Sequence, residues 1–211
     1  MASDDSWRRV RPFQRVEASQ VQFLDDAEAL RLVNVCPNDI RRMVVAALLT
    51  GARYGELAVA KVSDLDLAAS TLHVPVSKGG TARHIHLTRE GVEFFRPLAA
   101  DQPYKTRILT RGDGSAWGKS QQHRPLQVAC AAARISPAVS FHVLRHTYAS
   151  RLARAGVPML AIAAQLGHAD TRVTVKHYAH LAPDHVAQAV RAGFSDMMLA
   201  GPAVLLPDAA E

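Results

Sequence analysis

The sequence predicts an α+β fold that is mainly α-helical and carries a small three-stranded antiparallel sheet. In most of the chain, apolar residues recur every three to four positions, which is the spacing of one helix face. Between residues 64 and 88, apolar and polar residues alternate instead, which is the period of strands with one buried face. Hydrophobic residues make up 48% of the 211 positions, enough for the core of one globular domain.

The first half of the predicted domain contains helices that end at recognisable breaks. Asp25 or Asp26 can cap the first helix, and Pro37 interrupts it. Gly51 ends the second helix, because glycine readily takes the left-handed conformation that follows many helices. In chain order, the expected elements are helices at 24–36, 38–53 and 54–62 and strands at 64–67, 71–78 and 82–88.

Beyond the strands, the pattern is helical again. The last two strands are joined by a hairpin turn that contains KGGT, and a polar loop is expected at residues 100–119. The expected helices lie at 88–99, 120–135, 140–156, 158–167, 166–181 and 184–199. The sheet is therefore a minor component set between helices.

The charge of the chain favours a polyanionic partner. Lys and Arg number 25 against 19 Asp and Glu, and the sequence pI is about 9.7. Most of these cations are arginines, whose flat guanidinium groups bind phosphate oxygens in pairs. An even spread of the excess charge would only aid solubility, and a GC-rich genome gives the same arginine bias, so charge alone leaves the partner open.

Cysteine usage and hydropathy indicate a cytoplasmic protein without a membrane partner. Cys36 and Cys130 lie far apart in apolar surroundings and lack CxxC spacing, which is typical of buried thiols in a reducing compartment. The longest apolar run, residues 43–52, has about half the length that a membrane-spanning helix requires.

The segment FHVLRHTYASRL carries the first chemical signal. His142 and Arg145 are three positions apart and therefore share one face of the predicted helix. Arg53 lies just past the end of an earlier helix, and Lys78 lies in the hairpin. A histidine and an arginine near a helix start are more often a cap and a surface charge. The four residues taken together weaken this ordinary interpretation.

In this order, five motifs resemble those of the tyrosine recombinase or phage integrase family, from about Arg15 through Leu181. They are TGARYGEL, SKGGTARHIHL, HVLRH, LGHAD and HYAHL. The resemblance implies the family's catalytic-domain fold, the one that breaks and rejoins DNA. It implies catalytic roles for Arg53, Lys78, His142, Arg145, His168 and Tyr178. Supporting roles are expected for Glu56, Arg83, His146 and His177.

One spacing departs from the family's commonest form. That form has nine residues from the second histidine to the tyrosine, whereas His168 and Tyr178 are ten apart. A variant with one inserted residue and an HY doublet is also found among integrases, so Tyr178 is retained as the nucleophile. The rival, Tyr148, follows Arg145 on the same helix and is expected to pack in the core. Glu56 is expected to hold Arg53 rather than to react.

The implied chemistry can also be argued from the residues themselves. A phosphodiester is an anion that resists attack, and a phenol with a pKa of about 10 is mostly protonated at neutral pH. Arg53 and Arg145 can stabilise the charge that grows on the phosphoryl oxygens, and Lys78 can protonate the leaving 5' oxygen. His142 and His168 can donate to those oxygens or help to take the tyrosine proton. Because the phosphotyrosyl link keeps the bond energy, neither metal nor other cofactor is expected.

Three other functions remain open from the sequence. His142 and His146, four apart, could bind zinc with His168, His177 and His180, but no HExxH motif is present and Arg145 would oppose a dication. A type IB topoisomerase would share the chemistry and relax DNA without choosing a site. A catalytically inactive DNA-binding accessory is the third alternative, although every catalytic position is filled.

The resemblance also implies a domain plan and partners. We expect an Arg-rich tail or interdomain linker at 1–24, a catalytic domain at 25–182, a C-terminal helix for exchange between protomers at 183–200 and a flexible tail at 201–211. A separate DNA-binding domain ahead of the catalytic one is expected to be missing, by truncation or naturally. The expected partner is double-stranded DNA, on which a tetramer forms from monomers, in a bacterial, nucleoid-associated setting.

Overall fold

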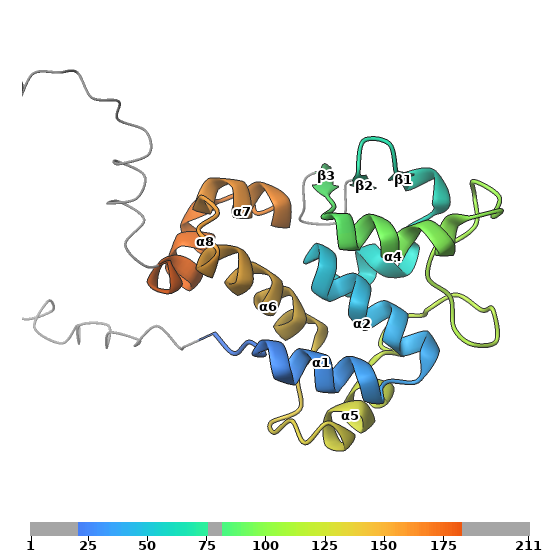
Figure 1. Cartoon of the computed structure of the whole chain (residues 1–211), viewed down its shortest axis with the longest axis horizontal. Helices are drawn as coiled ribbons and strands as arrows, with labels where there is room; N and C mark the ends of the chain where they lie inside the picture. Colours follow the sequence, from blue (N-terminus) through green and yellow to red (C-terminus); the bar gives the residue numbers. More distant parts are fainter. Residues whose placement is uncertain (1–20, 76–81, 183–211) are drawn as a thin grey trace, which may run out of the picture.

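The computed structural model describes residues 21–75 and 82–182 (Figure 1). Its α-helices are α1 (Asp26–Val35), α2 (Asn38–Thr50), α3 (Tyr54–Val59), α4 (Arg89–Ala99), α5 (His123–Ala132), α6 (Phe141–Arg154), α7 (Met159–Leu166) and α8 (Thr171–Tyr178). Short 3₁₀ helices are η2 (Val62–Asp64) and η3 (Ala179–Leu181), and the strands are β1 (Leu65–Asp66), β2 (Thr71–Val74) and β3 (Arg83–His86). The model confirms the predicted fold class.

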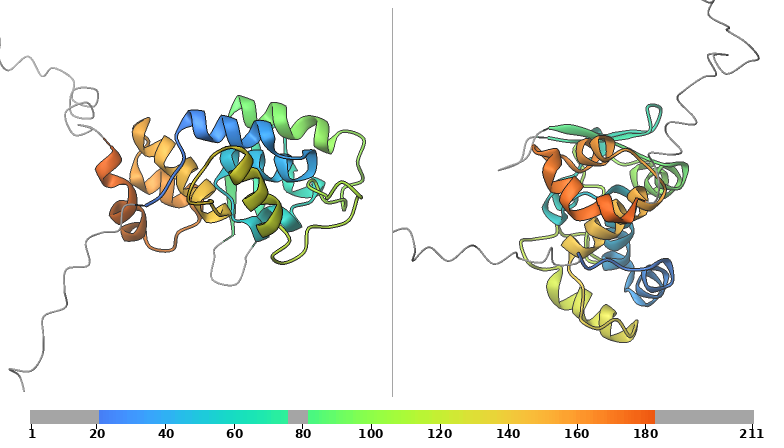
Figure 2. Two further views of the ribbon diagram at one scale, coloured as in Figure 1. Left: turned by 90° about the horizontal axis from the view of Figure 1, so that it is seen from below. Right: turned by 90° about the vertical axis from the view of Figure 1, so that its left-hand side faces the viewer.

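Helices α2 and α6 form the centre of the domain. Helix α2 packs against α6 and also against α1, α3 and α4. The sheet lies on one side of this centre, and α1 with α5 lies on the opposite side (Figures 1 and 2). Helix α2 is suited to this place because its side chains at Ile40, Met43, Val44 and Ala47 are fully buried.

The three strands form an antiparallel sheet in the order β1-β2-β3. Leu72 pairs with Leu65 on one side and with Ile85 on the other, and Val74 pairs with Arg83. Leu72, Val74 and Ile85 are buried, whereas the histidines that alternate with them along β2 and β3 lie on the more open face. Arg83 shares the inward face and so points toward the helices.

The hydrophobic core has two parts, and both include residues of α6. The larger part joins α1, α2, the sheet, α4, α5 and the first half of α6. The smaller part consists of Tyr148, Ala149, Ala153, Ile162, Leu166 and Tyr178 from α6, α7 and α8. Cys36 and Cys130 are buried free thiols of the larger part. Helix α6 thus connects the two parts, with His142, Arg145 and His146 near their junction.

The elements differ from the prediction mainly at their ends. The helix expected at 166–181 begins later than predicted, because Gly167 ends α7 in the left-handed conformation and Asp170 caps α8, which starts at Thr171. The third helix stops at Val59 rather than at residue 62. The expected helix at 184–199 lies outside the described residues. In the described part of the chain, no helix is both long and apolar enough to cross a membrane.

Candidate active site

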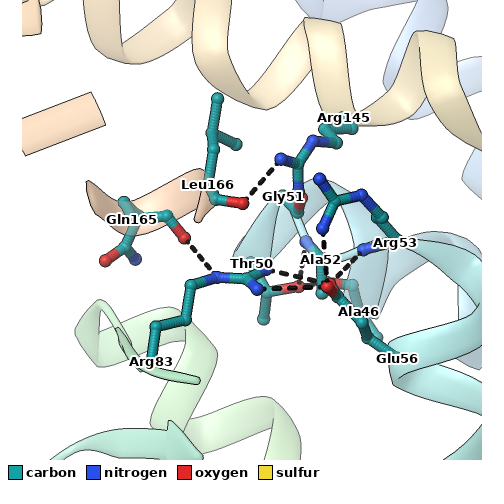
Figure 3. A network of polar contacts seen from close by, with 10 residues as sticks. All are labelled: Ala46, Thr50, Gly51, Ala52, Arg53, Glu56, Arg83, Arg145, Gln165 and Leu166. Atoms are coloured by element: carbon teal, nitrogen blue, oxygen red, sulfur yellow. Dashed lines mark hydrogen bonds and ion pairs between the residues drawn. The ribbon is translucent and has the colours of Figure 1, made fainter. Parts of the chain in front are cut away.

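Glu56 is the centre of an ion-pair network that joins two arginines (Figure 3). Arg53 immediately precedes α3, and Glu56 lies in the first turn of that helix. The backbone N–H of Arg53 donates to Oε2 of Glu56 at 2.7 Å, and Nη1 of Arg53 donates to Oε1 at 2.9 Å. Arg83 of β3 donates two further hydrogen bonds to the same carboxylate, at 3.1 and 2.8 Å. One carboxylate therefore positions both arginines.

Most of this network is buried. The side chains of Glu56 and Arg83 are 5% and 6% exposed, whereas that of Arg53 is 40% exposed. Burial acts to raise the pKa of Glu56, but the hydrogen bonds and charges of Arg83 and Arg53 lower it below its ordinary value. Glu56 therefore stays ionised and holds Arg53, while part of the Arg53 guanidinium still faces solvent.

Arg145 supplies a second guanidinium close to that of Arg53. It is 2% exposed and donates from Nη1 to the carbonyl oxygen of Gly51 at 2.8 Å and from Nη2 to that of Leu166 at 2.6 Å. Burial and the charge of Arg53 lower its pKa to about 10, so Arg145 remains charged at neutral pH. Two neutral carbonyl groups thus orient this guanidinium and leave its positive charge available to a ligand.

Two glycines let the backbone approach these arginines closely. Gly51 and Gly167 follow α2 and α7 and have φ angles of 64° and 69°. A Cβ at Gly51 would collide with the ring of Tyr148, and one at Gly167 would lie 2.8 Å from the Arg83 side chain. Any other residue at either position would strain the backbone and displace a neighbour.

Tyr178 is the last residue of α8, and its hydroxyl points at α6. The residue is 1% exposed, and its Oη forms a short hydrogen bond with Nδ1 of His146. The ring of His142 packs against that of His146 with centroids 4.3 Å apart, and the His177 ring lies 6.1 Å from His146. Burial raises the pKa of Tyr178 to about 12, although Arg145 acts in the opposite direction.

Burial and the nearby cations lower the pKa values of three histidines of the site, His142, His146 and His168. Burial, followed by the charges of His142, His177 and Arg145, lowers the pKa of His146 to about 4. Burial and the site arginines lower the pKa of His168 to about 4, and partial burial with Arg145 also lowers that of His142. Nδ1 of His168 lies 2.8 Å from Oγ1 of Thr174 in α8.

Tyr148, the rival nucleophile of the sequence analysis, lies in the core. It is 9% exposed, and its hydroxyl accepts a hydrogen bond from Nε2 of Gln165 at 2.9 Å. The Gln165 side chain also pairs with the backbone N–H and C=O of His86, and the backbone carbonyl oxygen of Gln165 accepts a hydrogen bond from Nε of Arg83. Gln165 therefore links β3, α6 and α7 directly behind the arginine network.

The structure brings most of the predicted site residues together. Nine of them come from the start of α3, from β3, from α6, from the residue after Gly167 and from the end of α8: Arg53, Glu56, Arg83, His142, Arg145, His146, His168, His177 and Tyr178. Lys78 lies outside the described residues. Sequence reasoning missed Gln165 and Thr174, because neither has a motif and both act through contacts that only the fold creates.

The histidine cluster does not form a metal centre in the part of the chain that the structure describes. Within residues 21–75 and 82–182, no three His, Cys, Asp or Glu side chains are arranged so that they could hold a metal ion. His146 and His168 instead direct Nδ1 at the hydroxyl groups of Tyr178 and Thr174.

Comparison with known proteins identifies tyrosine recombinases and integrases as relatives. The chain is 31% identical over 168 residues to tyrosine recombinase XerA of Pyrococcus furiosus, a match that covers 73% of this chain and 58% of that protein. The catalytic domain of bacteriophage HP1 integrase has 25% identity and a TM-score of 0.64, over 87% of this chain and 99% of that one. The Tn1549 transposon integrase, solved with circular intermediate DNA, shares the fold at 18% identity and a TM-score of 0.66, over 88% and 69% of the chains.

The matches to the curated relatives cover only part of each of those proteins. The chain spans about half of the length of the curated relatives it matches, from 47% to 60% in four of them. The model of the phage integrase family matches residues 22–185, which include every predicted site residue. A match over that much of the chain, together with the fold, shows that this chain belongs to the phage integrase family.

Proposed function

We propose that this chain is the catalytic domain of a site-specific DNA recombinase, which cleaves and rejoins strands through a 3'-phosphotyrosyl intermediate on Tyr178. One observation carries the proposal. Arg53 and Arg145 lie close together (Figure 3), and Oη of Tyr178 is hydrogen-bonded to His146, the residue that follows Arg145 on α6. Two fixed cations beside a tyrosine hydroxyl suit a phosphodiester that is attacked by a phenol.

In this mechanism, the arginines bind the nonbridging oxygens of the scissile phosphate. The Arg53 guanidinium is partly exposed and braced by Glu56, and Arg145 is fixed from behind by two carbonyl groups. Their interaction with the phosphate strengthens as charge develops on these oxygens in the transition state. We assign further donation to the same oxygens to His142 and His168.

The covalent step exchanges one phosphoester for another. Oη of Tyr178 attacks phosphorus, the bond from phosphorus to the 5' oxygen breaks, and that oxygen leaves with a proton that we assign to Lys78. The 3' end of the strand stays on Tyr178 as an aryl phosphoester. A 5' hydroxyl from another strand can then displace the tyrosine, so rejoining needs no ATP and no metal step.

We propose double-stranded DNA as the partner, met in the bacterial cytoplasm at the nucleoid. The shared fold of the DNA-bound Tn1549 integrase supports this partner. Two DNA sites must be cut and exchanged, which requires four active sites and hence a tetramer on DNA. We expect a monomer without DNA, and sedimentation that gives a stable DNA-free tetramer would contradict this. The helix assigned to protomer exchange, residues 183–200, lies outside the described residues.

Covalent capture tests the proposal without knowledge of the target sequence. The protein is incubated at low salt, in EDTA, with nicked duplexes whose central sequence is randomised. A short strand released by cleavage diffuses away, so that the enzyme stays trapped on its 3' end. The expected result is a protein–DNA adduct with a recurring junction sequence, lost in Tyr178→Phe and kept in Tyr148→Phe. An adduct that survives Tyr178→Phe, or one that EDTA abolishes, would refute the proposal.

A further inference from the structure

We propose that His146 is the base that takes the Tyr178 proton during cleavage and returns it during rejoining. This inference rests on the proposed function and adds one catalytic residue to it. Among the side chains that the structure describes, His146 is the one whose hydrogen bond to Oη of Tyr178 is observed. It comes from α6, one residue after Arg145, so the fold that fixes the phosphate-binding arginine also fixes this base.

The other two histidines of the site face different groups. His168 has its Nδ1 directed at Oγ1 of Thr174, which leaves the opposite edge of its ring for the phosphate. His142 is exposed, and its ring packs against the ring of His146 rather than against the tyrosine hydroxyl. By their positions, we assign His142 and His168 to the DNA and His146 to the nucleophile.

The environment of His146 favours a neutral ring that accepts a proton only as the reaction proceeds. Burial and the surrounding His142, His177 and Arg145 lower its pKa, and burial raises that of Tyr178, so the phenol remains protonated in the free protein. A bound phosphodiester adds a negative charge that offsets the positive charge of Arg145. The phenol also becomes more acidic as its oxygen bonds to phosphorus, so proton transfer is coupled to the attack.

The proton balance closes over a full cycle. In cleavage, the Oη–H proton moves to Nδ1 of His146 while Oη bonds to phosphorus, and the 5' oxygen leaves with the proton assigned to Lys78. In rejoining, a 5' hydroxyl attacks and gives its proton back to Lys78, the bond from phosphorus to Oη breaks, and His146 returns its proton to the tyrosine oxygen. No oxidant, metal or nucleotide enters either step.

The test separates proton transfer from packing. His146→Gln keeps a side-chain oxygen that can accept the tyrosine hydrogen bond but cannot take the proton. With a nicked duplex recovered by covalent capture, we expect this variant to bind DNA as the wild type does and to form the adduct about 100-fold more slowly. His146→Asn should behave alike, and thermal melting checks that both variants fold. His180→Gln, an exposed histidine two residues past the nucleophile, should keep the wild-type rate.

Replacement of Tyr178 by 3,5-difluorotyrosine provides the second readout. Its more acidic phenol depends less on a base, so the rate loss in His146→Gln should shrink by about tenfold in this background. An equal loss with both phenols would indicate packing alone and would overturn the inference, as would a wild-type rate in His146→Gln. Neither result would bear on the proposed function, which is refuted by a different outcome, an adduct that still forms with Tyr178→Phe.

Discussion

Single residues matter most in this domain where a guanidinium meets fixed acceptors. Two nitrogens of the Arg145 guanidinium donate hydrogen bonds, one to the carbonyl group of Gly51 and one to that of Leu166. A lysine has a single nitrogen and cannot reproduce this geometry. We expect Arg145→Lys to slow adduct formation about 100-fold and to lower the free energy of unfolding by about 1–3 kcal/mol, because a buried carbonyl loses its donor. Single-turnover capture and denaturant unfolding measure the two effects.

The matched control is Arg151→Lys on the same helix. The Arg151 side chain is 54% exposed and pairs at 3.3 Å with Asp26, whose side chain is 79% exposed. An exposed pair of this kind contributes at most about 1 kcal/mol, so this variant should cleave and unfold like the wild type. If Arg145→Lys also cleaved and unfolded like the wild type, the positive charge at this position would matter and the guanidinium geometry would not.

At the scale of elements, the end of α2 is where packing most restricts the choice of residue. Gly51→Ala would place a Cβ into the ring of Tyr148 at a residue with positive φ, so we expect a loss of at least about 1 kcal/mol in unfolding free energy. Gly55→Ala, inside α3, meets no atom within 4 Å and should be neutral or stabilising by about 0.4–1 kcal/mol. Chemical denaturation of both proteins makes the comparison, and a harmless Gly51→Ala would contradict the tight approach of α2 to α6.

The junction of β3 with α7 depends on one amide. Gln165→Leu removes the side-chain hydrogen bonds to His86 and Tyr148, and we expect it to lower the unfolding free energy by about 1–3 kcal/mol. Gln127→Leu on the exposed face of α5 is the control and should change stability by less than about 0.5 kcal/mol. Hydrogen exchange at β3 should also speed up in Gln165→Leu, and unchanged exchange there would argue against the junction.

These elements show what the sequence could and could not predict. Gly51 was placed at a helix end because its effect on the backbone is local, and Asp25 was placed at a cap for the same reason. The start of α8 was placed too early, at residue 166 rather than at Thr171, because the sequence alone did not show that Asp170 caps the helix. Gln165 could not be found, since its partner His86 lies 79 positions away in the sequence.

At the scale of the whole molecule, the site residues come from five separate elements and meet only when both parts of the core are packed. The sequence predicted nine residues that the fold brings together, because motif order carries that information. It did not predict the pairing of His146 with Tyr178, which depends on how α8 packs on α6. Assembly of the site should therefore track global folding, and its histidines should make stability depend on pH.

Burial of neutral histidines should destabilise the fold in mild acid. The pKa values of His146 and His168 are lowered to about 4 in the folded protein, against about 6.5 when unfolded. Between these values the unfolded chain binds more protons, so the unfolding free energy falls as pH drops from 6.5 to 4, by on the order of 2 kcal/mol per ring. Above pH 7 this contribution is constant.

Denaturant unfolding between pH 4 and 7 measures how the unfolding free energy depends on pH. His146→Gln should make this dependence shallower, whereas His84→Gln on the exposed sheet face should leave it unchanged. A flat profile in the wild type would mean that these rings are not buried in solution.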